Sequence, residues 1–394
     1  MWMQSYIRCD QLKIDGVRIF NHSNLNNDMM DIDGCRDVII TRVTGDSDDD
    51  GITFKSTCDR MSENIIVSDC LLSSHCNALK FGTETTAGFK NVAISNCVIR
   101  RSSASTVNSG AAEGISGISL EIVDGGTMEN ITIQNVAIDG QRVPLFLRLG
   151  NRARKHYAER YPSVGAMKNI LISNITAVAT APIGCSVMGI PEGKIEGLTI
   201  CNSRFVCTGG ESEELADKKV EELETLYPES TMFGTLPAYG MYVRHARNIQ
   251  LYGLSFELLK EDGRSAIICD DVDNSGYTAE QAYQLANADL FPKLGYQVYA
   301  IPDGQYLIGR NGKLNPHAAL GYSDGDYYYT PDNWSDEMFQ SNLRQEYNLS
   351  VSGGSDKLSY YLSASYLNDE GIIENSGFER ISTRMNVDYQ AKKW

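Results

Sequence analysis

Seven aspartates crowd two short stretches near the start of the chain, where they could carry out acid–base chemistry. They are Asp28, Asp31, Asp33, Asp46, Asp48, Asp49 and Asp50. Crowding raises the pKa values of some carboxylates, which gives a protonated acid beside an ionised base. Glycoside hydrolysis needs such a pair. Calcium binding and solvated turns are the alternatives, although EF-hand spacing is missing. The residue types alone leave all three interpretations open.

An internal repeat in residues 1–273 supplies the elements that must position these acids. In each copy a polar or small residue is followed by alternating apolar residues and a small polar cluster. Copies begin at residues 11, 37, 64, 91, 130, 169, 197 and 248. Strand-like units at a fixed period predict a solenoid. Because neighbouring coils lie about 4.7–4.9 Å apart, Asp28 and Asp49, roughly one coil apart in sequence, can converge.

Three of the intervals between copies are longer than the others. We interpret the extra residues as insertions in loops on one side of the stack, where solenoids build binding sites. One insertion, residues 211–224, keeps apolar residues at helical spacing and predicts a short surface helix. Most of the ten cysteines fall in or beside the repeats and are expected to be small apolar residues inside the solenoid. Whether one or two disulfides form cannot be deduced from the sequence.

Charge and hydrophobicity limit the classes of partner that the chain can bind. The formal charge of −16 disfavours nucleic acid and anionic membrane surfaces. No apolar run is long enough for a membrane-spanning helix, and the N-terminal residues do not form a signal-peptide pattern. The repeats begin almost at residue 1 without a polar cap, so we expect the N-terminal coils of the solenoid to be missing.

The sequence changes character after residue 273. Tyrosine becomes frequent, and residues 347–389 form long stretches in which apolar and polar residues alternate. Turn-forming residues at 353–356 and 368–371 separate them, which predicts antiparallel hairpins with one apolar face. A lipid-facing barrel wall and a soluble sandwich both fit this pattern.

The first part resembles a known enzyme family. Asn26-Asn-Asp28, followed by Asp49-Asp50-Gly-Ile-Thr-Phe-Lys-Ser, resembles the motif pair of family 28 glycoside hydrolases, the polygalacturonases and rhamnogalacturonases. This resemblance implies an all-β, right-handed parallel β-helix and hydrolysis of pectin-type polysaccharide or oligosaccharide with inversion, without metal or organic cofactor. It also implies that Asp49 is the general acid, and that Asp28 and Asp50 hold and activate the water.

Two departures from the family pattern affect the expected substrate contacts. Asn77 stands where the family has a histidine, and His75 lies two residues earlier, on the same face of a regular strand. Lys80, Asn77 and His75 are therefore candidate substrate-binding residues. The family's carboxylate-gripping Arg-x-Lys corresponds to Ser119-Leu-Glu121, which would repel a galacturonate.

A basic segment offers a substitute for the missing Arg-x-Lys. Residues 147–155 contain Arg154, Lys155 and two further arginines, Arg148 and Arg152; guanidinium groups suit carboxylates. We expect these two arginines to bind substrate, with an exposed basic loop as the alternative.

The second part resembles a different family. Several motifs resemble SusC/RagA-type TonB-dependent outer-membrane receptors, namely those beginning at Leu314, Trp334, Arg344, Tyr360, Leu367 and Phe378. The resemblance implies antiparallel hairpins from a partial outer-membrane barrel and association with the outer membrane. We therefore expect a glycoside hydrolase-like domain at 1–273, a receptor-like fragment at 274–394, and a fusion near residues 273–275.

The combined prediction is an enzyme that hydrolyses pectin-type polysaccharide. A non-catalytic glycan-binding β-helix is one alternative, favoured by the two departures. An outer-membrane component of glycan uptake is the other, suggested by the second part. Either resemblance implies a secreted, periplasmic or outer-membrane-associated protein of a Gram-negative bacterium.

Overall fold

The computed structural model describes residues 2–157, 161–273, 299–302, 305, 307, 314–323, 328–329, 343–371 and 376–391. Most of the predicted junction at 273–275 and the motif beginning at Trp334 lie outside these residues. Packing divides the chain into two units: the first holds all the parallel strands and the second all the antiparallel ones.

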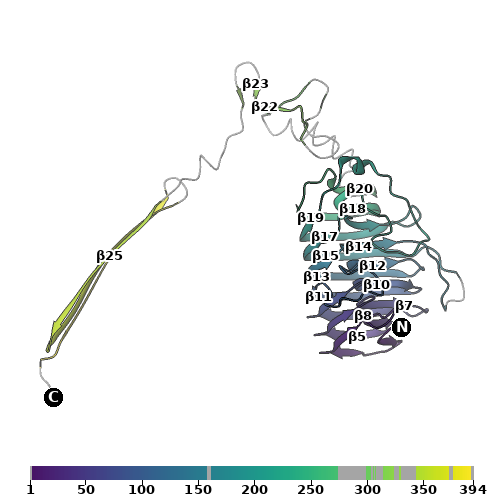
Figure 1. Cartoon of the computed structure of the whole chain (residues 1–394), viewed down its shortest axis with the longest axis horizontal. Helices are drawn as coiled ribbons and strands as arrows, with labels where there is room; N and C mark the ends of the chain where they lie inside the picture. The colour runs from purple at the N-terminus through teal and green to yellow at the C-terminus, as the bar shows by residue number, and fades with distance from the viewer. Residues whose placement is uncertain are drawn as a thin grey trace. The chain divides into compact units, whose positions relative to one another are not determined.

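The first unit is a right-handed parallel β-helix, which confirms the predicted fold class (Figure 1). Its coils present three ladders of parallel strands. The first ladder contains β1 (Ser5–Ile7), β4 (Met30–Asp33), β7 (Ile52–Ser56), β10 (Asn77–Thr85), β12 (Ser116–Ile122), β14 (Val143–Leu149), β16 (Cys185–Met188), β18 (Ala238–Arg247) and β20 (Ser265–Asp273).

The other two ladders begin separately and then merge into longer strands. The second contains β2 (Lys13–Asp15), β5 (Arg36–Thr41), β8 (Ser62–Ser68), β11 (Gly88–Ile99), β13 (Thr127–Gln141), β15 (Ala166–Ala179), β17 (Ile195–Cys207) and β19 (Gln250–Leu258). The third starts with β3 (Arg18–Asn21), β6 (Thr44–Ser47) and β9 (Leu71–Ser74). From β11 onward a single long strand serves both ladders, since its end also pairs with β9.

The core follows from alternation along the first ladder. Ile32, Phe54, Phe81, Leu120 and Leu147 occupy one register column and are fully buried. Burial of each such side chain stabilises the fold by about 1.5–3 kcal/mol. Because side chains alternate between faces, the neighbouring column turns polar residues to the outer face of this ladder. The candidate site lies there.

One corner of each coil is made by an asparagine in the left-handed backbone region. Asn64, Asn91, Asn130 and Asn169 have φ values of 54–58°, which asparagine tolerates better than most residues. Each donates from Nδ2 to the side-chain oxygen of the residue one coil earlier, beginning with Asp37, at 2.6–3.0 Å. This amide ladder explains why the sequence repeat is anchored at these positions.

The long intervals in the repeat are loops beside the first ladder. They are residues 100–115, 150–165 and 208–237, and each joins that ladder to a neighbouring one. The predicted helix at 211–224 was wrong in extent, because only η1 (Glu213–Asp217) forms, a short 3-10 helix. Arg244 and Arg148 donate to the carbonyls of Val220 and Glu222 instead, which ties this segment to the β-helix.

All ten cysteines are free, and most are buried. This agrees with their expected place among the small apolar residues of the solenoid. Among the described residues, none of the helices has the length and apolar character needed to cross a membrane.

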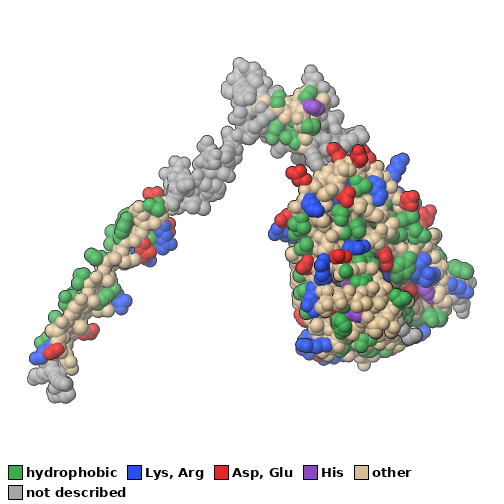
Figure 2. All heavy atoms as spheres, viewed as in Figure 1, with side chains coloured by type: hydrophobic (Ala, Val, Ile, Leu, Met, Phe, Trp, Pro, Cys, Tyr) green, Lys and Arg blue, Asp and Glu red, His purple; other side chains and the backbone are tan. Residues whose placement is uncertain are grey.

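The second unit contains the predicted antiparallel hairpins. β25 (Arg344–Ser355), β26 (Leu358–Glu370) and β27 (Gly377–Tyr389) form a three-stranded sheet. Two short antiparallel pairs precede it: β21 (Tyr299–Ala300) with β22 (Ala319–Leu320), and β23 (Tyr322–Ser323) with β24 (Tyr328–Tyr329). Figure 2 shows hydrophobic side chains along the surface of the three-stranded sheet; they include the exposed Leu349, Leu362, Ile381 and Met385.

Candidate active site

The backbone brings the three predicted catalytic aspartates onto successive coils. Asp28 lies two residues before β4, and the Asp49–Asp50 pair lies between β6 and β7. Met29 N donates to Asp50 O at 2.8 Å, and Gly51 N donates to Asn77 O at 2.7 Å. A Cβ atom on Gly51 would stand 2.2 Å from Ala78 O, so this close approach of two coils requires glycine.

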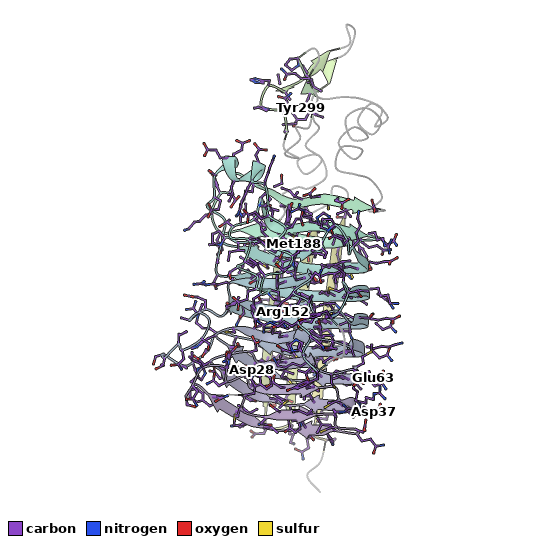
Figure 3. The ribbon with its side chains drawn as sticks, turned by 90° about the vertical axis from the view of Figure 1, so that its right-hand side faces the viewer. Asp28, Asp37, Glu63, Arg152, Met188 and Tyr299 are labelled. Atoms are coloured by element: carbon purple, nitrogen blue, oxygen red, sulfur yellow. The ribbon has the colours of Figure 1, made fainter. Side chains whose placement is uncertain are left out.

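A cleft of about 890 Å³ opens over these aspartates. The three long loops all contribute to its wall. Its lining residues are Trp2, Asn26, Asp28, Asp49, Asp50, Lys55, Cys76, Thr83, Glu84, Ser109, Gly110, Arg154, Tyr227 and Glu229. Figure 3 shows Asp28 on the opposite side of the stack from Asp37 and Glu63, which lie near the amide ladder.

Asp50 is held by three donors from the next coil. Its Oδ1 accepts from Asn77 N at 3.1 Å and from Asn77 Nδ2 at 2.7 Å, and its Oδ2 accepts from Lys80 Nζ at 2.9 Å. Each carboxylate oxygen has two lone pairs. Oδ1 is therefore fully used, and Oδ2 keeps one acceptor position for a molecule in the cleft.

Asp49 and Asp28 have raised proton affinity. Burial, and then the charge of Asp50, raises the pKa of Asp49. The same two causes raise the pKa of Asp28 to about 9, although Lys55 opposes them. Asp49 Oδ1 accepts from Asp50 N at 2.9 Å, which fixes that side chain at the cleft wall. The cleft thus holds two carboxyl groups with raised pKa values beside a carboxylate that is paired with Lys80.

Lys55 is the second buried cation of the site. Its Nζ lies 3.0 Å from Glu84, 3.4 Å from Asp31 and 3.6 Å from Asp28. Burial works against its charge, but these acids raise its pKa well above the usual value. Despite burial, Lys55 lowers the pKa of Glu84 to about 2. Burial raises the pKa of Asp31 to about 7, and neither Asp31 oxygen has a hydrogen-bond partner.

The 208–237 loop covers the cleft with Tyr227. Its hydroxyl accepts from Lys80 Nζ at 3.2 Å and from Thr83 Oγ1 at 3.1 Å. The Arg152 guanidinium lies 5.8 Å from the centre of the Tyr227 ring. The same loop brings Glu229 to the wall, where burial raises its pKa.

The two arginines expected to bind substrate lie in different surroundings. Arg152 forms an ion pair with Asp124, lies 3.7 Å from Glu84, and stays beside the cleft. Arg148 is fully buried and donates to Gly189 O at 3.1 Å and to Glu222 O at 2.6 Å. The structure therefore places Arg148 behind the wall, and Arg154 is the arginine that lines the cleft.

The other three residues predicted to bind substrate also lie in different places. Asn77 and Lys80 lie directly beneath Asp50 and are buried. His75 is fully buried, and its Nδ1 forms a 2.9 Å hydrogen bond with Asp48 Oδ1 rather than lining the cleft. It lies at a corner between β9 and β10, so the strand alternation that would give it the same face as Asn77 does not extend to it.

Sequence reasoning missed several residues of the site. Lys55, Glu84, Tyr227 and Glu229 line the cleft without having been singled out. The register could have suggested Lys55, because it pairs with Asp33 on the preceding coil. Tyr227 comes from an insertion without a repeat signal.

Two clusters of side chains have spacing suitable for a metal ion among the described residues. In the first, oxygens of Asp49 and Asp50 and the sulfur of Cys76 lie within 4.8 Å of one another. Calcium takes oxygen ligands, so the thiol makes this cluster a poor calcium site. The second comprises His22, Asp48 and His75.

Comparison with known proteins gives partial matches. No protein-family model matches the chain. The TonB-dependent receptor P3 of Formosa agariphila is 36% identical over 74 residues, which are 18% of this chain and 7% of the receptor. The TonB-dependent receptor SusC of Bacteroides thetaiotaomicron is 32% identical over 54 residues, 14% of this chain and 5% of the receptor. The chain therefore spans less than a tenth of the length of these relatives.

One solved structure is similar to the β-helix. It is a hyperthermoactive exopolygalacturonase from Thermotoga maritima, with a TM-score of 0.47 and 17% sequence identity. The match covers 65% of this chain and 50% of that chain.

Proposed function

We propose that this chain hydrolyses glycosidic bonds in a pectin-type polysaccharide, with Asp28, Asp49 and Asp50 as its catalytic residues. The observation that supports this proposal is the meeting of the three acids in one cleft, from adjacent coils. Two of them have raised pKa values, and the third forms an ion pair with Lys80. Such divided environments suit an acid and a base at the same pH.

Asp49 donates its proton to the glycosidic oxygen as the bond to the anomeric carbon breaks. A water molecule attacks that carbon and gives its proton to Asp50, through the acceptor position left on Oδ2. Asp28, whose pKa of about 9 keeps it protonated at neutral pH, orients the water beside Asp50. Each proton transfer of this kind typically contributes about 10²–10⁴-fold to the rate.

Cations at the cleft favour an acidic sugar such as galacturonate. Lys55 and Arg154 line the wall, and Arg152 lies just behind it. Arg154 is exposed, so its guanidinium can receive a substrate carboxylate without displacing a buried partner. The acids Glu84 and Glu229 restrict where that carboxylate can lie, because like charges repel.

Release of reducing sugar from polygalacturonate and rhamnogalacturonan tests the proposal. The natural chain should release reducing ends, and Asp49→Asn and Asp50→Asn should each lower kcat by about 10²-fold or more. Asp59→Asn serves as a matched control, since the Asp59 side chain is 88% exposed and outside the cleft. Equal activity in all variants would refute the catalytic assignment.

A glycan-binding protein without catalysis is the second candidate. It is favoured by Asn77 and Glu121, which stand where the family pattern has a histidine and the lysine of Arg-x-Lys. Tight oligosaccharide binding without any reducing-sugar release would identify this function.

The short matches to TonB-dependent receptors support a third candidate, a component of glycan uptake at the outer membrane. The exposed apolar residues of β25–β27 are consistent with it. Partition of the full chain into detergent or outer-membrane vesicles would support this role, and recovery in the aqueous fraction would oppose it.

A further inference from the structure

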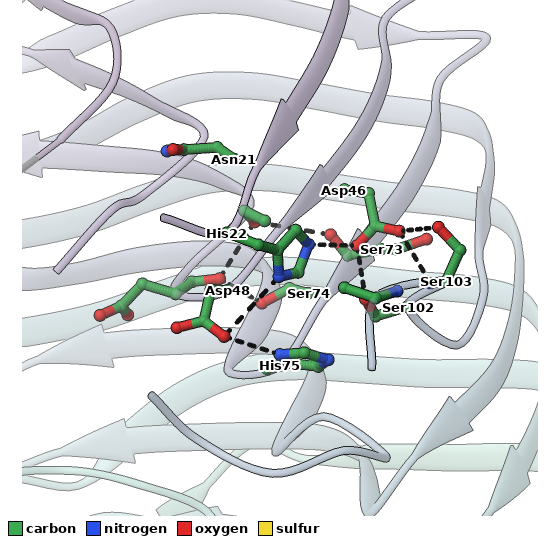
Figure 4. Close-up of polar contacts among 12 residues, drawn as sticks. Asn21, His22, Asp46, Asp48, Ser73, Ser74, His75, Ser102 and Ser103 are labelled. Atoms are coloured by element: carbon green, nitrogen blue, oxygen red, sulfur yellow. Dashed lines mark hydrogen bonds and ion pairs between the residues drawn. The ribbon is translucent and has the colours of Figure 1, made fainter. Parts of the chain in front are cut away.

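Two histidines and an aspartate stack on three successive coils, behind the residues that line the cleft and not among them. His22 follows β3, Asp48 follows β6 and His75 follows β9, each by one residue. Asp48 N donates to Asn21 O at 2.9 Å, and His75 N donates to Ser47 O at 3.1 Å, so the three positions are in register. Figure 4 shows the three side chains turned toward one another.

The Nδ1 atom of His22 faces a carboxylate oxygen of Asp48 but forms no hydrogen bond with it. His22 Nε2 lies 2.9 Å from Asp46 Oδ1, so Nε2 carries the proton donated to that carboxylate. In the neutral imidazole Nδ1 then carries a lone pair; this atom is buried, has no hydrogen-bond partner and lies 3.6 Å from Asp48 Oδ1. Two lone pairs repel each other unless a cation lies between them. The His22 side chain is only 5% exposed, so water cannot readily screen this contact.

The two carboxylates at this stack also have no lysine or arginine partner among the described residues. Asp46 and Asp48 are both buried. Asp46 instead accepts hydrogen bonds from Ser102 Oγ and Ser103 N, and Asp48 accepts them from the backbone N–H groups of residues 108 and 109. Buried carboxylates of this kind are normally paired or bound to metal.

We propose that His22, Asp48 and His75 bind a divalent first-row transition-metal ion, with zinc as the best match to two imidazoles and a carboxylate. The three residues each place a ligand atom within 4.8 Å of the others. Asp48 Oδ1 lies 2.9 Å from His75 Nδ1 and 3.6 Å from His22 Nδ1. Ligand atoms about 2.1 Å from a tetrahedral zinc stand about 3.4 Å apart, which these separations bracket.

Asp46 fits the role of an outer partner of this site. Histidines that bind metal usually donate their other ring N–H to a carboxylate, which fixes the tautomer. Asp46 accepts from His22 Nε2 in that way. By contrast, His245 has carboxylates on both nitrogens, with Asp271 at 2.6 Å and Glu222 at 3.1 Å, and leaves no nitrogen free for a metal.

The ion would stabilise one wall of the cleft. Asp46 and Asp48 hold the 100–115 loop through Ser102, Ser103 and backbone N–H groups of residues 108 and 109. Ser109 and Gly110 of that loop line the cleft, and Asp48 directly precedes Asp49. The proposed metal is therefore structural, and it differs from the sequence-based expectation that no metal takes part.

Zinc titration of the full chain tests the proposal. After dialysis against a chelator, the natural chain should bind one equivalent of zinc by calorimetry, and its Tm should rise with zinc concentration. His22→Gln and Asp46→Asn should each weaken binding by about 10-fold or more. His245→Gln, a histidine between two acids at another place in the fold, should bind zinc as the natural chain does.

A spectroscopic measurement on the natural chain guards against misfolded variants and against zinc held by cysteines. The cobalt-substituted chain should show d–d absorption without a thiolate charge-transfer band. A thiolate band would overturn the proposal, as would unchanged zinc binding in a folded His22→Gln variant. Lack of zinc binding to the natural chain at a tenfold molar excess would also overturn it.

Discussion

Lys80 Nζ lies 2.9 Å from Asp50 Oδ2, and both side chains are almost completely buried. A buried ion pair is sensitive to loss of one partner, because the other charge then remains without compensation. The stability of the candidate site therefore depends on keeping these two charges together.

Replacement of Lys80 with methionine should strongly destabilise the chain. The charge of Asp50 would lose its cation, which typically costs about 3–5 kcal/mol. Lys90→Met is the matched control, since Lys90 forms an exposed pair with Glu129 at 3.8 Å, worth at most about 1 kcal/mol. Thermal unfolding measures both. The double variant Lys80→Met/Asp50→Asn should recover part of the loss, and a double variant no more stable than Lys80→Met would contradict the pairing.

Asp28→Asn should stabilise the chain while lowering activity. The pKa of Asp28 is raised from 3.8 to about 9 by burial and by Asp50. The folded state thus holds more protons than the unfolded state between about pH 4 and pH 9, and stability falls as pH rises through this window. The amide removes that loss, so at pH 8 we expect a gain of about 1 kcal/mol or more, or about 2–4 °C in Tm. Unfolding midpoints across pH check this, and a variant with the same slope as the natural chain would refute it.

Arg154 and Arg148 should differ in their effects on substrate. Arg154→Ala should raise KM for an acidic oligosaccharide by about fivefold, which corresponds to an exposed ion pair of about 1 kcal/mol. KM for a neutral oligosaccharide should not change. Arg148→Ala leaves two buried carbonyl groups unpaired, so it should lower stability by about 2 kcal/mol and affect both substrates equally. If only Arg148→Ala lost the preference for the acidic oligosaccharide, then Arg148 and not Arg154 would be the residue that binds the substrate carboxylate.

The stereochemistry of the product distinguishes two roles for Asp50. Oxygens of Asp49 and Asp50 lie within 4.8 Å of each other, closer than the about 6.5–9.5 Å common in inverting enzymes. This short spacing by itself favours retention. The inversion implied by the resemblance of the motif pair requires that Asp28 and Asp50 together hold the water. Proton NMR of the first-formed anomer measures the outcome. Retention would make Asp50 a nucleophile.

The sequence predicted a solenoid of strands because the coil length appears directly as a repeat, and the motif resemblance then implied the β-helix. The anchor positions 64, 91, 130 and 169 are the asparagine corners, where backbone conformation restricts residue choice. Asp28, Asp49 and Asp50 could be brought together for the same reason, since one coil of chain separates them. Their proximity follows from the fold.

The contacts of the loops that cover the outer face of the first ladder could not be predicted from the repeat. Arg148 does face outward from β14, but the 208–237 loop folds over it and takes its donors. The expected helix stops at Asp217, and the residues after it are held instead by Arg148 and Arg244, which donate to the carbonyls of Glu222 and Val220. Contacts of this kind join residues far apart in sequence and follow no period. The grouping of His22 with Asp48 and His75 was not predicted for a related reason: each residue lies about one coil from the next, and the three form no short local motif.

The amide ladder makes one complete coil the unit by which the β-helix can be lengthened or shortened. Each amide contacts an equivalent group one level away, so duplication or excision of a complete coil would restore the same contact between new neighbours. Loops at the other corners can lengthen without disturbing it, as three of them already have. The length of the cleft and the residues that line it can therefore evolve separately in this architecture. The length changes by complete coils, and the lining changes by single residues in the loops.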